Sequence, residues 1–290
     1  MNMKYCLTLI LIALLALAMP LSALAAEELV LAGPYEIEQT DVEFASRDVT
    51  LTGILTVPQG DSEKYPTAIL THGFMGDTKD TDNLAEYLGK NGIVCLQINL
   101  MGSGTSGGDY ADSDFTTQPD DILNALAYVK TLDVVDTNNI FLIGKSQGGF
   151  DSGLAALECE DEINALCMWF PAFCIPDNFR AGTVMFKEFD VNDIPDSIEM
   201  RPGYSVGKGM IEQSMEMNIE EIFPTFSKDV LIIHGDNDRV VDISYSLQMA
   251  PLYPHATLTI LPGGGHGFQG QNELDALAYT YAFIMNHIVA

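Results

Sequence analysis

The chain has 290 residues, of which 47% are hydrophobic, and its formal net charge at pH 7 is −28. A chain this rich in apolar residues can build a core, so intrinsic disorder is excluded. The strong negative charge argues against nucleic acid and anionic membrane surfaces as partners, because both repel an acidic protein. Acidity of this degree is typical of a protein that has to stay soluble outside the cell.

The first 26 residues have the pattern of a signal peptide. Lys4 precedes an apolar stretch over residues 7–18, and the small-x-small sequence that a signal peptidase reads follows at residues 23–25. The stretch is shorter than the roughly 20 residues that span a bilayer, so we expect cleavage and no stable membrane insertion. An uncleaved anchor is the alternative. Residues 27–290 are then predicted to form one secreted domain with a sizeable core.

Four cysteines remain after cleavage: Cys95, Cys159, Cys167 and Cys174. Cys95 and Cys167 lie inside apolar runs, where cysteine usually acts as a small buried hydrophobic residue. Export permits disulfides, so the sequence leaves their pairing open. None has metal-ligand spacing, and the glycines of residues 102–107 lack the spacing of a dinucleotide fingerprint. We therefore expect neither a metal nor a cofactor.

The order of apolar segments predicts the fold class. Residues 42–44 and 49–57 are typical of an antiparallel pair of strands. From Pro66 onward, short apolar runs alternate with helical periodicity, and these runs are residues 67–71, 93–98, 140–143, 163–169, 230–233 and 257–261. Continuous apolar strands separated by helices indicate a parallel sheet covered on both faces. Right-handed crossovers then predict a doubly wound α/β fold.

Residues 172–226 depart from this rhythm, since they contain no strong strand run and are rich in proline and methionine. An insertion of this length after the sixth strand predicts a lid over the carboxyl edge of the sheet, where α/β proteins bind ligands. Its methionines either line an adaptable apolar pocket or fill the core of a small helical cap.

The pentapeptide Gly144-Lys145-Ser146-Gln147-Gly148 follows one of the apolar runs and leads into small residues. A strand that ends in Gly-x-Ser-x-Gly and turns into a helix holds its serine on a strained bend, with the hydroxyl exposed above the helix N-terminus. Glycine is needed at both ends because a Cβ there would collide with the neighbouring strand or helix. Ser146 is the predicted nucleophile, and the backbone N–H of Gln147 is a predicted oxyanion donor.

A serine hydroxyl needs a base, and the base needs an orienting acid. His266 lies among glycines directly after the last predicted strand, which makes it the expected base. The acid is expected after residues 230–233, where spacing leaves both Asp236 and Asp238 open. His72 follows an earlier strand and is expected to bridge loops. Because the base must be unprotonated, activity should fall in acid.

The order Ser146, aspartate, His266 is that of the α/β-hydrolases, and the chain resembles this superfamily over residues 42–289. In that family the acid is the last residue of His-Gly-x-x-Asp, which selects Asp238. The resemblance also assigns the second oxyanion donor to the backbone N–H of Phe74.

Within the superfamily the chain is similar to the bacterial cinnamoyl (feruloyl) esterases. The similar features are His72-Gly73-Phe74, the Gly-Lys-Ser-Gln-Gly-Gly run, residues 99–106 and the long insert. In that group the insert forms a lid, and an aspartate near its start holds the phenolic end of the substrate, a role that the resemblance carries to Asp177. Where that lid offers an aromatic pair that includes tyrosine, this chain has Gly209-Met210, so Met210 is expected to shape a different pocket.

These features predict a secreted serine esterase that forms an acyl-enzyme intermediate. The expected substrates are small-molecule or polysaccharide-linked esters with hydroxycinnamoyl or short acyl groups. Two alternatives stay open. One is a serine peptidase of the prolyl type, which shares the triad. The other is a non-catalytic exported module that binds a ligand.

Overall fold

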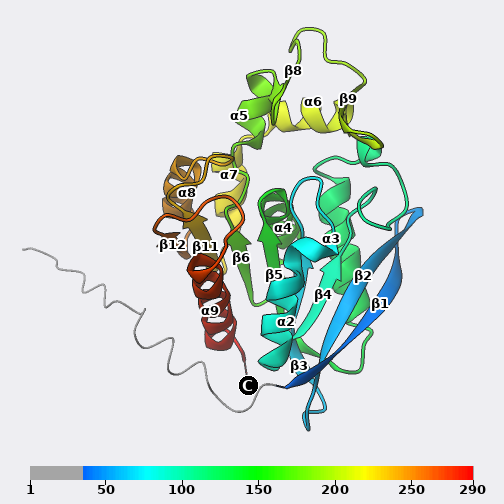
Figure 1. The fold of residues 1–290 in the computed structure, drawn as a ribbon, viewed down its shortest axis with the longest axis vertical. Helices are drawn as coiled ribbons and strands as arrows, with labels where there is room; N and C mark the ends of the chain where they lie inside the picture. Colours follow the sequence, from blue (N-terminus) through cyan, green and yellow to red (C-terminus); the bar gives the residue numbers. More distant parts are fainter. Residues whose placement is uncertain (1–34, 290) are drawn as a thin grey trace, which may run out of the picture. The chain divides into compact units, whose positions relative to one another are not determined.

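An eight-stranded sheet organises residues 35–289, which are the residues that the computed structural model describes (Figure 1). The predicted signal peptide, residues 1–26, lies outside the described residues. The strands of the main sheet are β1 (Glu36–Ser46), β2 (Val49–Gln59), β3 (Tyr65–Thr71), β4 (Val94–Ile98), β5 (Val135–Lys145), β6 (Ala165–Trp169), β11 (Val230–Gly235) and β12 (Ala256–Leu261). The helices beside them are α2 (Asp82–Lys90), α3 (Thr117–Val129), α4 (Gln147–Glu158), α8 (Ser244–Met249) and α9 (Gln271–Asn286).

The strand order is β1-β2-β4-β3-β5-β6-β11-β12. β1 pairs with β2 and β2 with β4 in antiparallel register, while every later neighbouring pair is parallel. The predicted opening hairpin and the predicted parallel strands are therefore confirmed, and each of the six apolar runs contributes to a strand of the sheet.

Two apolar layers cover the two faces of this sheet, because side chains alternate sides along each strand. In β3, Ile69 packs into the layer that holds α3 and α4, whereas Ala68 and Leu70 pack into the layer that holds α2 and α9. Helices on both faces of a mostly parallel sheet make the fold the doubly wound one that was predicted.

The segment after β6 carries its own small elements, which lie together at one end of the main sheet in Figure 1. They are α5 (Ile175–Arg180), β7 (Thr183–Val184), β8 (Lys187–Glu188), β9 (Ser197–Arg201), β10 (Tyr204–Gly207), α6 (Lys208–Glu216) and α7 (Ile219–Ile222). β7 pairs with β8 and β9 with β10 as two separate antiparallel sheets. The sequence did not predict these four strands, since the segment has no strong strand run. Each strand has two to five residues and one partner, so none shows a long continuous apolar run.

The cysteines Cys95, Cys159, Cys167 and Cys174 are all buried and free. Cys95 and Cys167 thus occupy the apolar positions that their sequence settings predicted, and burial raises the pKa of the Cys167 thiol to about 12. Over residues 35–289, no helix combines the length and apolarity that crossing a bilayer requires. In the same part of the chain, no group of three or more His, Cys, Asp or Glu side chains is arranged to hold a metal ion.

Candidate active site

Ser146 is the single residue between the end of β5 and the start of α4. Its backbone has φ 54° and ψ −120°, a conformation that a residue with a Cβ rarely adopts. The end of β6 and the segment after it hold this residue there: the Ser146 N–H donates to Trp169 O over 2.9 Å, and Ser146 O accepts from the Ala172 N–H over 3.0 Å. Strain of this kind persists only where the surroundings impose it, and it is common at functional sites. The strained bend predicted from the pentapeptide is present.

The glycines on each side of Ser146 allow this bend. A Cβ built on Gly144 would lie 2.0 Å from Gly148 O, and one built on Gly148 would lie 2.2 Å from His72 O. Both contacts are to backbone atoms, which cannot rotate away. The predicted reason for the glycines, collision with a neighbouring strand or helix, is therefore confirmed.

Gly148→Ala is expected to lower the free energy of unfolding by about 3 kcal/mol or more, at the upper end of the cost of overpacking that forces the backbone to move. Thermal denaturation followed by circular dichroism measures this. Gly209→Ala is the matched control, because a Cβ on that helical glycine meets nothing within 4 Å. Equal melting temperatures for the two variants would contradict the packing argument.

The structure brings Ser146, His266 and Asp238 into one hydrogen-bonded chain. The Ser146 hydroxyl donates to His266 Nε2 over 3.0 Å, and His266 Nδ1–H donates to Asp238 Oδ2 over 2.8 Å. The carboxylate can only accept, so its contact fixes the proton on Nδ1 and leaves Nε2 free to accept. Asp236 does not reach the histidine, since its Oδ1 accepts the Gly263 N–H in a turn.

Four donors surround the Asp238 carboxylate. Oδ1 accepts the backbone N–H groups of Val240 and Val241 at 2.8 and 3.0 Å, and Oδ2 lies 3.3 Å from His234 Nε2 in addition to its bond with His266. Burial acts to raise the pKa of Asp238, but the hydrogen bonds from His234, His266 and the backbone outweigh it and hold the pKa below the ordinary value. Asp238 is therefore a carboxylate, as an orienting acid must be.

The contact between His234 and the Asp238 carboxylate was not predicted from the sequence. Its Nε2 faces two acceptors, Val241 O at 3.0 Å and Asp238 Oδ2, so that nitrogen carries the proton. Nδ1 then accepts from the Ser246 hydroxyl over 2.7 Å. The spacing of four residues between His234 and Asp238 allows this contact but does not by itself define the turn that forms it.

Phe74 and Gln147, whose backbone N–H groups are the predicted oxyanion donors, line the same cavity as Ser146. Among residues 35–289, neither N–H finds a hydrogen-bond acceptor. Gln147 is the first residue of α4, where N–H groups point out of the helix and favour negative charge. Two free N–H groups beside a serine hydroxyl are the arrangement that binds an oxyanion.

His72 joins two loops beneath this site, as its sequence position suggested. Its Nδ1–H donates to Gly73 O over 2.8 Å, and the Leu100 N–H donates to its Nε2 over 3.2 Å. Burial lowers the pKa of His72 and keeps the ring neutral.

Ser146 opens into an apolar cavity of about 60 Å³ beneath the segment that follows β6. Met210, on α6, lines it with only 1% of its surface exposed. None of the described residues that line this cavity carries a formal charge. Phenylalanines, valines and methionines make up most of its wall.

Asp177 does not line this cavity, which corrects the position carried over from the feruloyl esterases. Helix α5 turns Ile175, Asn178 and Phe179 toward the cavity, and these positions share one face because they are three and four residues apart. Asp177 falls on the opposite face. Its carboxylate is exposed and accepts from Arg180 Nη1 and from the Tyr245 hydroxyl, both over 3.1 Å.

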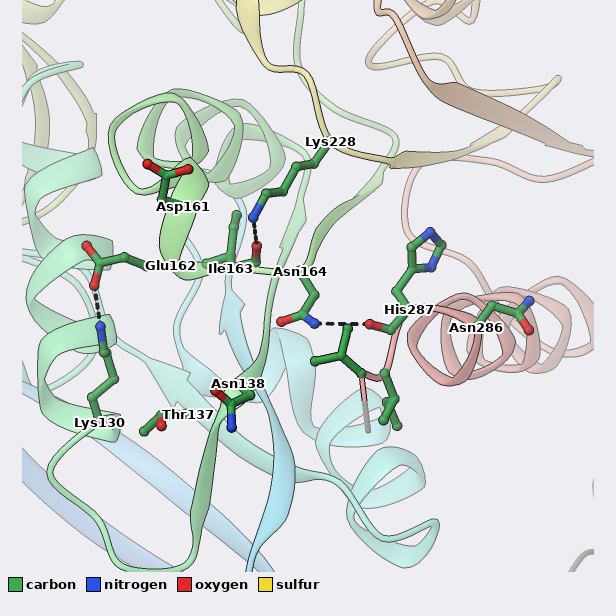
Figure 2. A pocket seen from close by; sticks show the side chains of 12 residues that line it. Lys130, Thr137, Asn138, Asp161, Glu162, Ile163, Asn164, Lys228, Asn286 and His287 are labelled. Atoms are coloured by element: carbon green, nitrogen blue, oxygen red, sulfur yellow. Dashed lines mark hydrogen bonds and ion pairs between the residues drawn. The ribbon is translucent and has the colours of Figure 1, made fainter.

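A wider hollow of about 620 Å³ lies at the other end of the sheet, near the residues that precede β6 and β11 (Figure 2). Both of its lysines are already bound: Lys130 pairs with Glu162, and Lys228 donates to the carbonyl of Ile163. His287 lies nearby without a serine partner. No nucleophile and base are in contact among the described residues that line this hollow, so Ser146 and His266 stay the candidate site.

The mostly parallel sheet, the serine on its bend and the order of the three side chains define an α/β-hydrolase. The model of the prolyl oligopeptidase family matches residues 79–289. The chain belongs to that family.

A solved structure and two curated proteins resemble the chain. Est1E from Butyrivibrio proteoclasticus, in a structure with ferulic acid bound, is 29% identical with a TM-score of 0.78, covering 85% of this chain and 98% of Est1E. The carbamate hydrolase RutD of Caulobacter sp. (strain K31) is 32% identical over 41% of this chain and 43% of RutD. The quorum-quenching protein AidA of Acinetobacter baumannii (strain MDR-ZJ06) is 31% identical over 38% of this chain and 36% of AidA. The chain thus spans less than half the length of each of these two curated relatives.

Proposed function

We propose that this protein hydrolyses carboxylic esters, with Ser146 as nucleophile, His266 as general base and Asp238 as orienting acid. The observation that carries the proposal is the unbroken chain of hydrogen bonds from the Ser146 hydroxyl through His266 to a carboxylate. The likeness to Est1E over nearly its whole length supports it.

In the acylation step, Ser146 Oγ forms a bond to the ester carbonyl carbon while His266 Nε2 takes the hydroxyl proton. The carbonyl oxygen becomes an oxyanion, which the N–H groups of Phe74 and Gln147 stabilise. Asp238 stabilises the imidazolium as it forms. The imidazolium then gives its proton to the leaving alcohol oxygen as the carbon–oxygen bond breaks, and an acyl-Ser146 ester remains.

In the second step, water takes the place of the alcohol. His266 Nε2 removes a proton from water, whose oxygen attacks the acyl carbon at the same oxyanion site. The proton returns to Ser146 Oγ as its bond to the acyl carbon breaks. The acid product leaves and the free enzyme is restored.

The acyl cavity favours short aliphatic acyl groups. Its volume of about 60 Å³ is far below the roughly 300–1,000 Å³ of pockets for drug-sized ligands. Its wall offers no charged group to a phenol, since Asp177 faces away from it. A feruloyl ester is the second candidate, because Est1E binds ferulic acid. Binding of a feruloyl group would require the segment after β6, which lies over the cavity, to move.

A series of p-nitrophenyl esters tests the acyl preference. We expect kcat/KM to fall at least about tenfold from butyrate to decanoate, because a hydrophobic pocket discriminates by about this factor for each group that does not fit. Met210→Ala should enlarge the cavity and move the preference to longer chains. Methyl ferulate turned over as fast as butyrate, or no dependence on chain length, would contradict a short acyl pocket.

Membership of the prolyl oligopeptidase family makes amide hydrolysis the competing activity. A peptidase that selects the free amino terminus of its substrate needs an acidic group to bind the ammonium. No acidic residue lines the described cavity at Ser146. An aminoacyl-proline amide in the ester panel measures this activity, and turnover of the amide at the ester rate would favour the peptidase.

Export is part of the proposal, because Lys4, the apolar residues 7–18 and the small residues 23–25 match a signal peptide. The protein would then meet small or polysaccharide-linked esters outside the cell. N-terminal sequencing of the mature protein tests this. A chain that retains Met1 would contradict cleavage.

A further inference from the structure

The loop that carries the Phe74 N–H is strained at its next residue. Met75 has φ 59°, in the left-handed region that a residue with a Cβ adopts at a cost. Such a conformation persists only where neighbouring groups hold it. The direction of the Phe74 N–H depends on this backbone, so whatever holds Met75 also aims the donor.

The hairpin of β9 and β10 holds both polar groups of Met75. Arg201, at the end of β9, donates from Nη2 to Met75 O over 3.0 Å. The Met75 N–H donates to the hydroxyl of Tyr204, the first residue of β10, over 3.1 Å. These two bonds join residues more than 120 positions apart in the chain.

Aromatic packing extends the contact to the side chains of Phe74 and Gln147, the two residues that carry the N–H donors. The Tyr204 ring stacks on Tyr110 with centroids 4.2 Å apart, and the Phe74 ring meets the two tyrosines edge-on at 5.8 and 5.9 Å. The Tyr110 hydroxyl accepts the side-chain amide of Gln147 over 2.8 Å. Arg201 lies over the outer side of the Tyr204 ring, 5.1 Å from its centroid.

We propose that Arg201 and Tyr204 are positioning residues for the oxyanion site, so that the β9–β10 hairpin completes this site as well as covering it. The proposal rests on the proposed function, in which Phe74 and Gln147 stabilise an oxyanion. Neither Arg201 nor Tyr204 lines the cavity at Ser146, so both act through Met75 and Tyr110 and not on the substrate. A hairpin displaced from Met75 leaves the Ser-His-Asp chain intact but the oxyanion site poorly formed.

Tyr204→Phe tests this with the smallest change, because it removes the acceptor oxygen and keeps the stacked ring. Removing an oxyanion donor outright costs about 10²–10³ in kcat, so loosening one should lower kcat by about tenfold. KM should change less than about twofold, since the oxyanion exists only in the transition state. Arg201→Gln, at an exposed position, should lower kcat in the same direction.

A boronic acid inhibitor presents an anionic oxygen to the oxyanion site. Its affinity therefore reports on this site specifically and not on a general loosening of the fold. Its affinity should fall by the same factor as kcat in Tyr204→Phe and Arg201→Gln, while KM for the neutral ester changes less than about twofold. Arg180→Gln is the matched control, because Arg180 donates to the carbonyls of Met215 and Met217 in the same segment without touching the oxyanion loop.

Ser146→Ala, measured in parallel, separates the two proposals. If Ser146→Ala still hydrolyses the ester, the proposed function itself is wrong. If Ser146→Ala is inactive but Tyr204→Phe and Arg201→Gln keep wild-type kcat and boronate affinity, the positioning role alone is overturned. A rise in KM with unchanged kcat would make Tyr204 a substrate contact and overturn it as well.

Discussion

Replacement of Ser146 by alanine is expected to lower kcat for ester hydrolysis by about 10⁴–10⁶, the loss seen when a serine hydrolase keeps its oxyanion site but has no nucleophile. The fold should be retained. The Ser146 side chain makes a single hydrogen bond, to His266, and alanine places the same Cβ on the strained backbone.

Initial rates on p-nitrophenyl butyrate, with circular dichroism to check folding, measure this effect. Ser152→Ala is the control, because Ser152 lies on α4, the helix that follows Ser146. Its hydroxyl bonds to the Thr71 hydroxyl, and Ser152 does not line the cavity. Turnover by Ser146→Ala at the wild-type rate would contradict the proposal that Ser146 is the nucleophile. A folded wild type that hydrolyses no ester would instead favour the non-catalytic ligand-binding module.

Asp238→Asn is expected to lower kcat by about 10⁴. The asparagine oxygen can still accept from Val240 and Val241, which leaves its NH₂ group facing His266 Nδ1. Nδ1 then has to accept, so the proton moves to Nε2, which can no longer take the proton of Ser146. Rates across a range of pH measure the loss. Near wild-type activity would show that the carboxylate does not set the tautomer.

The free energy of unfolding of Asp238→Asn should depend less on pH in the acid range than that of the wild type. The pKa of Asp238 is lower in the folded protein than in the unfolded chain, where a value near 3.9 is expected. Its carboxylate therefore adds stability above the unfolded pKa, and this contribution is lost as the pH falls through the folded pKa. Urea midpoints should fall more steeply with acid in the wild type than in Asp238→Asn. Parallel falls would contradict this linkage.

The sheet and the candidate triad could be predicted because their signals are local. A buried parallel strand is a continuous apolar run, and the bend at Ser146 needs its glycines within two residues. His266 and the aspartate each follow directly after a strand. The parallel sheet then brings these three strand ends to one edge without further information.

What could not be predicted depends on contacts between distant residues or on which face a short helix presents. The pairing of Tyr204 with Met75 joins segments 129 residues apart, and the short strands β7–β10 have one partner each. Asp177 stands beside residues that line the cavity, yet the phase of α5 turns it away. The bond from His234 to Asp238 depends on a turn that spacing alone does not define.

Mass spectrometry of the enzyme, quenched with acid during turnover of p-nitrophenyl butyrate, tests the central claim most directly. The account predicts one butyryl group per chain, on the peptide that contains Ser146, and none on Ser146→Ala. Turnover with no adduct, or an adduct on another residue, would contradict an acyl-enzyme at Ser146.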